Sequence, residues 1–340
     1  MEERLKKIFV SICLVIFLVS GTAKTEIPNP LNVGIISTES STVLAKNWMT
    51  FIDDLSTYLN VEVKPFFAAD YAGIIEGMRF KKVHLAWFGN KSAMVAVDRS
   101  GGEIFAQTIK FDGTEGYYSL LIAHKDSPIN SLEDVMKCDK SLTFGNGDPN
   151  STSGFLVPSF YVWAKNNQEP KNCFKRVLTS NHSGNALAVA NKKVDIATNN
   201  TENIYDRLKK TNPTAFKKIK EIWRSPLIPS DPMVWRKDLN MATKEKLAYF
   251  FLQYGRFGDL EKIKRERESL AKMSDGWGPF LASSNAQLIP IRQLALFKNK
   301  LKIQKDAKLS ESEKKAKISK IDSALADVAK YKAAVGDGGN

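Results

Sequence analysis

The sequence predicts an α/β protein of two lobes with parallel-rich sheets, joined by two crossings of the chain and followed by a helical tail. The chain has 340 residues, more than a single hydrophobic core usually supports. Short apolar segments rich in branched residues alternate with segments of helical periodicity, a pattern typical of parallel sheets with flanking helices. Segment 219–236 contains three prolines, and we expect it to return the chain to the first lobe.

Residues 1–23 have the layout of a secretory signal peptide. Lys6 and Lys7 precede an apolar run at 8–20, and small residues follow up to a predicted cleavage site near Ala23. The run is shorter than the roughly 20 residues that a membrane-spanning helix needs. We therefore expect an exported mature protein that begins near residue 24.

The first part of lobe 1 is predicted at 24–116. Residues 31–36 form an apolar strand, and apolar positions at helical spacing predict a helix over 47–60. Segment 61–68 alternates as a second strand. Asp70 caps a helix through residue 80, and 84–89 form a third strand.

Lobe 2 is predicted at 117–226, with 227–298 returning to lobe 1. The alternation continues from the apolar strand at 117–124, and a further strand at 142–147 leads into a helix at 155–167. The remainder, 299–340, is a charged helical tail. Its apolar positions predict one long helix from about 295 to 334, whose apolar stripe could pair with a second copy or face solvent.

Composition limits the classes of function. The formal charge is +13, and removing the three cations and two anions of the signal peptide leaves +12. The cations are spread along the chain, so we expect no nucleic-acid partner; an anionic ligand and a merely basic surface both remain open. Only Cys138 and Cys173 follow the signal peptide, and either a disulfide or two thiols would fit. Nothing in the spacing indicates a metal or cofactor.

The clearest local motif is 145–154, GNGDPNSTSG, which lies between a predicted strand and a predicted helix. Its glycines let the backbone approach a ligand, and Ser151, Thr152 and Ser153 add hydroxyl donors at the start of the helix, where the dipole favours an anion. No Gly-Lys-Ser/Thr follows, so it is not a Walker loop. A helix start that merely caps itself is the alternative.

Other polar residues stand where a cleft would form. Glu202 follows a strand at 194–200 and could hold a cation, and Asp231 lies in the return between the lobes. Tyr71 and Tyr117 could wall the pocket, and His182 could donate to an anion. The structural alternatives are a first-turn glutamate, a turn aspartate, packed tyrosines and a surface histidine.

Together these segments resemble the phosphonate-binding component, the substrate-binding protein, of bacterial phosphonate ABC transporters. The resemblance extends from about Leu31 to Lys298, whereas the signal peptide and tail are less alike. The segments that carry it are STESS, FFAADYAGIIEGMRF, FGNGDPNSTSGFLVP, NALAVANKKVDIATNNTEN, SPLIPSDPMVWRK and LIPIRQLALFK. It implies a type II periplasmic-binding-protein fold that closes over alkylphosphonates, with 2-aminoethylphosphonate as characteristic ligand, and an ABC permease as partner in the periplasm.

The resemblance also implies roles for the candidate residues. Glu202 and Asp231 would hold the ligand ammonium, and Tyr117 would line the pocket. The residues that would receive the phosphonate oxygens are Tyr71, Ser151, Thr152, Ser153 and His182. Departures from the family lie beside them, at 180, 181, 183 and 229–231.

Two rival functions remain. A binder of phosphite, phosphate or another small oxyanion would have no ammonium to satisfy Glu202 and Asp231. A phosphoryl-group hydrolase would need a metal triad, a nucleophile motif with a poised histidine, or a cofactor loop, and the sequence offers none. We therefore expect a binding protein and not an enzyme.

Overall fold

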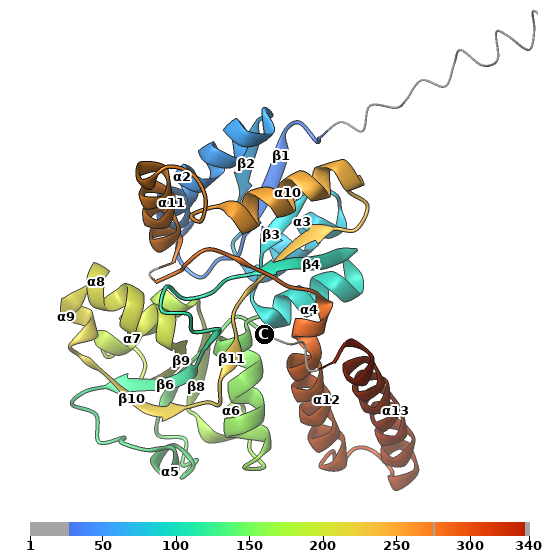
Figure 1. Cartoon of the computed structure of the whole chain (residues 1–340). Coiled ribbons are helices and arrows are strands. Elements are labelled where there is room, and N and C mark those ends of the chain that lie inside the picture. Colours follow the sequence, from blue (N-terminus) through green and yellow to red (C-terminus); the bar gives the residue numbers. More distant parts are fainter. Residues whose placement is uncertain (1–26, 275, 337–340) are drawn as a thin grey trace, which may run out of the picture.

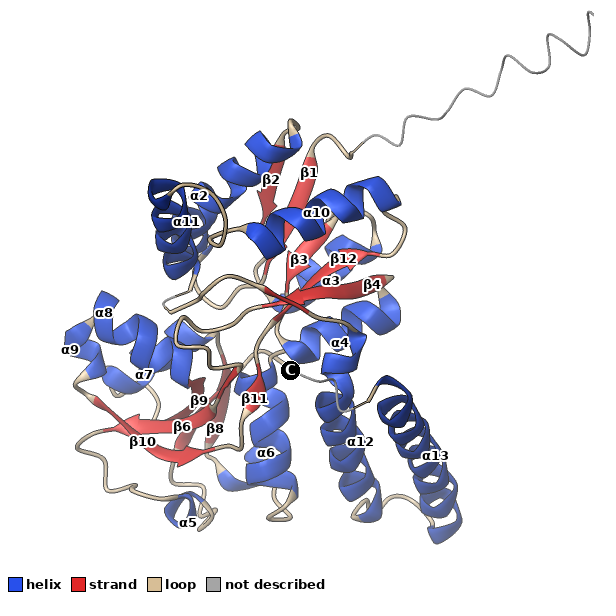
Figure 2. Cartoon of the chain, in the orientation of Figure 1, coloured by secondary structure: helices blue, strands red, loops and turns tan. Residues whose placement is uncertain are grey.

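A computed structural model describes residues 27–274 and 276–336, so the predicted signal peptide lies outside the described residues. Two α/β lobes lie one above the other in Figure 1, and a pair of helices extends from the C-terminal part of the chain. Figure 2 shows a sheet in each lobe with helices packed around it.

Lobe 1 is built on a six-stranded sheet with the order β13-β4-β12-β3-β1-β2. Strand β1 pairs in parallel with β2 and β3, whereas β12, which returns from the other lobe, is antiparallel to β3 and β4. The strands are β1 (Leu31–Ile35), β2 (Val63–Phe66), β3 (Leu85–Trp87), β4 (Gly102–Gln107), β12 (Pro232–Arg236) and β13 (Leu281–Ala282).

The helices of lobe 1 bury an apolar face against this sheet. Trp48, Phe51 and Leu55 of the first helix are fully buried, as their helical spacing predicts. This helix begins at Ser41, before the predicted residue 47, because Ser40 accepts a hydrogen bond from the Val43 amide and caps it. The helices are α2 (Ser41–Leu59), α3 (Tyr71–Arg79), α4 (Asn90–Arg99), α10 (Met241–Gln253) and α11 (Leu260–Met273).

Lobe 2 repeats the arrangement with the order β10-β6-β9-β7-β8. Strand β7 is parallel to β8 and β9, and β6, which enters from lobe 1, is antiparallel to β9 and β10. In each lobe the strand from the other lobe is thus inserted antiparallel beside a parallel trio. The strands are β6 (Ser119–His124), β7 (Thr143–Asn146), β8 (Arg176–Thr179), β9 (Ile196–Asn200) and β10 (Ile219–Arg224).

Several helical segments of lobe 2 are short or of π type. The predicted helix at 155–167 begins earlier and runs from η1 through η2, two π-helical segments. The segments are α5 (Leu132–Val135), η1 (Thr152–Leu156), η2 (Ser159–Ala164), α6 (Pro170–Cys173), α7 (His182–Ala190), η3 (Glu202–Leu208), α8 (Lys209–Thr211) and α9 (Pro213–Phe216). A disulfide joins Cys138, just after α5, to Cys173 in α6, which resolves the choice that the sequence left open.

The chain crosses between the lobes twice, at β5 (Gly116–Tyr117) and β11 (Ile228–Pro229), which pair with each other antiparallel. A Cβ atom on Gly116 would lie 2.4 Å from the Ile228 carbonyl oxygen, so this close approach requires glycine. The boundary predicted after 116 lies within β5, and the boundary predicted after 226 lies just before β11. Segment 219–236 is not only a connection, because its first residues form β10 within lobe 2.

The tail is two helices, so the prediction of one long helix was wrong. After η4 (Asn285–Leu288), α12 (Ile289–Gln304) ends before a turn at 305–310, and α13 (Glu311–Val335) then packs beside α12 (Figure 2). A capping box between Ser310 and Glu313 starts the new helix. The helical spacing of apolar residues continues across the turn, and this explains why the sequence predicted a single helix. The apolar stripe of α13, including Ile318 and Leu325, is half-buried within this hairpin.

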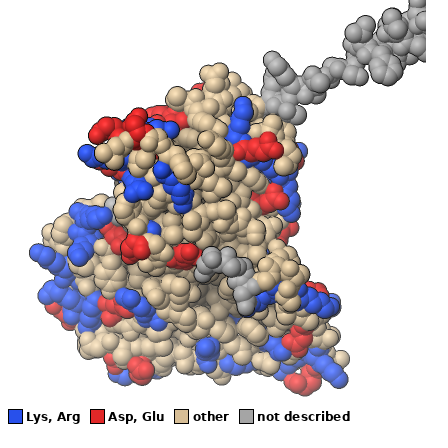
Figure 3. Space-filling view, in the orientation of Figure 1, with Lys and Arg blue, Asp and Glu red and all other residues tan. Residues whose placement is uncertain are grey.

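On the face shown in Figure 3, Lys and Arg are spread over both lobes and interspersed with Asp and Glu. Among the described residues, no helix is both long and apolar enough to cross a membrane.

Candidate functional site

All eight candidate residues line one cavity between the lobes. The cavity volume is about 20 Å³. The candidates found there are Tyr71, Tyr117, Ser151, Thr152, Ser153, His182, Glu202 and Asp231. Residues outside these eight candidates also line it: Thr38, Trp87, Asn200, Asn203, Arg207 and Ser274.

The start of η1 forms one end of the cavity. Ser151 caps η1, because its Oγ accepts from the Gly154 amide at 2.9 Å, so the self-capping alternative is true of this residue. Thr152 Oγ1 accepts from the Lys91 amide of α4 at 2.9 Å, which joins the two lobes. Its hydroxyl proton can still be donated into the cavity. The first amides of a helix also lack intrahelical partners and favour an anion.

His182 is the first residue of α7, after the capping residue Asn181. Its Nε2 lies 3.5 Å from Ser153 Oγ and 3.4 Å from Asn200 Nδ2, so the imidazole faces the start of η1. Burial and the nearby charge of Arg207 lower the pKa of His182 to about 4. The ring is therefore neutral at pH 7. Ser151, Thr152, Ser153 and His182 together form what we call the hydroxyl end.

Asp231 lies between β11 and β12, where the second crossing enters lobe 1. Its Oδ1 accepts from the Tyr117 hydroxyl at 3.0 Å, and its Oδ2 accepts from Trp87 Nε1 at 3.2 Å. Asp231 is buried, and burial together with the charge of Glu202 raises its pKa well above the usual range. Burial, with the charges of Asp231 and Glu202, also raises the pKa of Tyr117.

Glu202 is the first residue of η3, follows the end of β9 after Thr201, and lines the same cavity. Burial raises its pKa, and the charges of Lys110 and Arg207 partly oppose that effect. We call Glu202 and Asp231 the carboxylate end. Within residues 27–274 and 276–336, no three His, Cys, Asp or Glu side chains gather as a set of metal ligands.

Tyr71 begins α3 in lobe 1, capped by Asp70, and its amide donates to Asp148 Oδ2 of lobe 2 at 3.2 Å. Burial raises the pKa of its hydroxyl, and the charges of Asp231 and Asp148 add to the effect, so the group remains a donor. Because both lobes contribute to the wall and bond to each other around it, the structure is a closed form.

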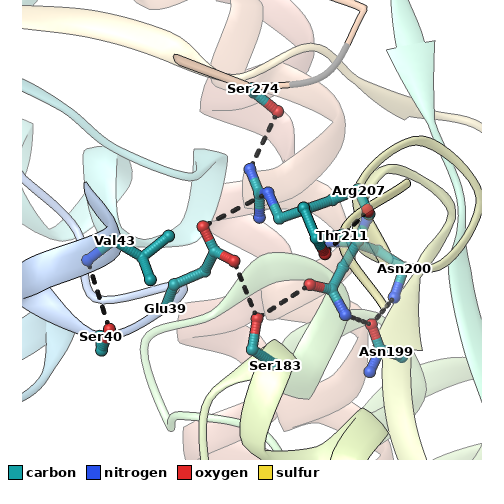
Figure 4. A network of polar contacts seen from close by, with 10 residues as sticks. Glu39, Ser40, Val43, Ser183, Asn199, Asn200, Arg207, Thr211 and Ser274 are labelled. Carbon is teal, nitrogen blue, oxygen red and sulfur yellow. Dashed lines mark hydrogen bonds and ion pairs between the residues drawn. The ribbon is translucent and has the colours of Figure 1, made fainter. Parts of the chain in front are cut away.

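Only some of the other lining residues have a local signal in the sequence. Asn200 lies at the end of β9, in the junction where polar side chains were expected to meet a ligand. Trp87 ends strand β3, and the carboxyl end of that strand was the signal that could have identified it. Arg207 has no such signal. It lies one π-helical turn after Glu202, and only the tertiary structure brings it to Glu39 of the other lobe, at 3.4 Å (Figure 4).

Known proteins are similar to this chain in sequence and in architecture. A family model described as "ABC transporter, phosphonate, periplasmic substrate-binding protein" matches residues 33–288. The chain is 52% identical over 320 residues to the phosphonates-binding periplasmic protein of Escherichia coli K12, with 94% of this chain and 92% of that protein covered.

Two solved structures are similar. A binding protein component of an ABC phosphonate transporter from Pseudomonas aeruginosa is 53% identical with a TM-score of 0.85, covering 90% of this chain and 99% of the other. PhnD1 of Prochlorococcus marinus, solved in complex with methylphosphonate, is 25% identical with a TM-score of 0.69, covering 80% and 99%. These relatives are binding proteins of type II periplasmic fold and not enzymes. The chain therefore belongs to the family of periplasmic substrate-binding proteins of phosphonate ABC transporters.

Proposed function

We propose that this protein captures alkylphosphonates, with 2-aminoethylphosphonate preferred, and delivers them to the permease of an ABC importer. The observation that carries the proposal is the polarity of the cavity. One end presents hydroxyls, a neutral histidine and the start of a helix, and the other presents the carboxyl groups of Glu202 and Asp231. 2-Aminoethylphosphonate is a zwitterion with the matching polarity.

At the hydroxyl end, Ser151, Thr152, Ser153 and His182 receive the phosphonate oxygens, with the Tyr71 hydroxyl as a further donor. The Ser153 hydroxyl is already held by Asn200, and the Thr152 hydroxyl by the Lys91 amide, so these donors need little ordering when the ligand arrives. Neutral donors can bind an oxyanion without placing a large net charge in the interior.

At the carboxylate end, Glu202 and Asp231 hold the ammonium, and Tyr117 orients Asp231 through its hydroxyl. Each charge-assisted hydrogen bond contributes about 1.5 to 3 kcal/mol. Phosphite and phosphate lack an ammonium, so they would bring negative charge to two carboxyl groups with no ligand cation to offset it. This disfavours the simple-oxyanion alternative.

A thermal-shift screen followed by calorimetry tests the proposal. 2-Aminoethylphosphonate should bind 1:1 and more tightly than methylphosphonate, phosphite or phosphate. At 100 times its dissociation constant a ligand stabilises the folded protein by about 2.7 kcal/mol, which the screen detects. Equal affinity for 2-aminoethylphosphonate and methylphosphonate would contradict the ammonium role of the carboxylate end. Release of phosphate or acetaldehyde from the ligand would contradict a purely binding function.

Export and assembly belong to the same proposal. N-terminal sequencing of protein secreted to the periplasm should place the new terminus near residue 24, because Gly21, Thr22 and Ala23 provide small residues at the cleavage site. Pairing of two copies through the tail stays a prediction. Sedimentation of the full protein and of a variant ending before α13 would test it.

A further inference from the structure

A buried ion pair joins the two lobes beside the ligand cavity. Glu39 belongs to the loop between β1 and α2 in lobe 1, and Arg207 belongs to η3 in lobe 2. Arg207 Nε lies 3.4 Å from Glu39 Oε2, and Arg207 Nη2 donates to Ser274 Oγ, just after α11 of lobe 1, at 3.2 Å. Arg207 therefore holds two separate segments of the opposite lobe, as Figure 4 shows.

Lobe 2 supplies a second contact to the same carboxylate. The Ser183 hydroxyl of α7 lies 3.2 Å from Glu39 Oε1 and equally far from Asn203 Oδ1 of η3. The side-chain amide of Asn203 in turn donates to Asn199 Oδ1 in β9, and the backbone amide of Asn203 donates to Asn200 Oδ1. Figure 4 shows these contacts from Glu39 to Asn199 and Asn200. Because Asn199 and Asn200 also contact His182, the contact is continuous with the polar network at the hydroxyl end.

Burial distinguishes this pair from other ion pairs of the molecule. The side chains of Arg207 and Glu39 are 8% and 10% exposed, whereas the cross-lobe pair Lys110–Asp206 is 20% and 27% exposed. Two charges buried together lose their hydration, and removing one partner leaves the other buried and uncompensated, which is strongly unfavourable. When the lobes separate, both side chains can regain water.

We propose that Glu39 and Arg207 form a latch that holds the lobes closed over the bound ligand and sets how slowly the ligand leaves. A contact whose partners come from different lobes stabilises only the closed form, so it shifts the equilibrium toward closure. Neither residue needs to touch the phosphonate for this effect. Both are positioning residues, and Ser274 and Ser183 fix their geometry.

The charge of Arg207 in the latch also acts on the ligand site. Arg207 lines the cavity, and its charge is one cause of the lowered pKa of His182. An oxyanion at the hydroxyl end is therefore attracted by the same guanidinium that holds the lobes together. Ligand binding and closure should favour each other through this residue.

The test measures dissociation of 2-aminoethylphosphonate by stopped-flow fluorescence. Trp87 lines the cavity between the lobes, so its fluorescence reports on closure. Glu39→Gln and Arg207→Met should each accelerate dissociation at least tenfold with association changed less than threefold, because association occurs to the open form. The double variant should be no faster than the faster single variant, and Arg207→Lys should be intermediate.

A matched control and a structural readout complete the design. Glu221→Gln alters a glutamate whose partner Arg224, at 2.8 Å, lies on the same strand of lobe 2, and it should leave dissociation unchanged. Melting temperatures of the ligand-free latch variants should equal that of the unaltered protein. Unchanged dissociation in the latch variants, additive effects in the double variant, or an equal loss of ligand-free stability would overturn the latch.

The inference rests on the proposed function, because closure is triggered with a phosphonate. Binding by the unaltered protein reports on that function alone. The ratio of dissociation rates between variant and unaltered protein reports on the latch, whichever of 2-aminoethylphosphonate and methylphosphonate is bound.

Discussion

The two ends of the cavity handle charge in opposite ways. At the hydroxyl end, Thr152, Ser153 and His182 have protein partners from several elements, and the imidazole is neutral. At the carboxylate end, Asp231 is buried, and burial together with the charge of Glu202 raises its pKa. The first end suits any small oxyanion, whereas the second is relieved only by a cation. Affinity and selectivity should therefore be separable by mutation.

The largest expected effect comes from neutralising the carboxylate end. The double substitution Glu202→Gln and Asp231→Asn keeps the shapes but removes two charge-assisted bonds to an ammonium. It should weaken 2-aminoethylphosphonate by about 3 to 6 kcal/mol, roughly 10² to 10⁴-fold. Methylphosphonate should bind as before or more tightly, because like-charge repulsion disappears. Calorimetry with both ligands measures the ratio, and a parallel loss would break the distinction between the ends.

At the hydroxyl end, Thr152→Ala should weaken both phosphonates alike, by about 1.5 to 3 kcal/mol, since one hydrogen bond to a charged group is lost. Thr152→Ser is the matched control, because it retains the hydroxyl that contacts the Lys91 amide and should retain most of the affinity. Calorimetry again provides the measurement. If Thr152→Ala affected only the amino compound, the hydroxyl end would not be the phosphonate site.

Proton release on binding should differ between the two ligands. In the ligand-free cavity the pKa values of Asp231 and Glu202 are raised, and an adjacent ammonium lowers them, so both lose protons when 2-aminoethylphosphonate binds. Its affinity should rise with pH and level off above the ligand-free pKa values, by at most about tenfold per pH unit for each proton released.

Calorimetry in buffers of different ionisation enthalpy counts these protons. Comparing 2-aminoethylphosphonate with methylphosphonate removes most of the contribution of the phosphonate group, which both ligands carry. The extra release should shrink in Glu202→Gln. Equal proton release for the two ligands would show that the carboxylates do not respond to the ammonium.

How far the sequence predicts this molecule depends on whether the signal is local. Alternating segments and turn residues predict the two lobes, and Asp70 and the Ser-Thr-Ser motif mark two helix starts that the structure contains. The tail was mispredicted because periodicity does not register a six-residue turn with a new capping box. The eight cavity residues were found because they lie at the ends of predicted strands, at helix starts and in the crossings. Glu39 and Arg207 were missed because their pairing exists only once the lobes meet.

The smallest expected effect concerns Tyr117, whose hydroxyl contacts Asp231 at the carboxylate end. Tyr117→Phe removes the hydroxyl that donates to Asp231 Oδ1, while Trp87 still holds Oδ2. That hydroxyl favours the ionised form of Asp231, so its loss should weaken 2-aminoethylphosphonate by about 0.5 to 1.5 kcal/mol, roughly 2- to 12-fold, and leave methylphosphonate unchanged. Tyr205→Phe, which removes a hydroxyl bound to Glu221 on the surface of lobe 2, serves as control in the same calorimetric series. A larger loss of affinity for methylphosphonate would instead show that Tyr117 contacts the phosphonate group. Tyr117 would then belong to the hydroxyl end and not to the carboxylate end.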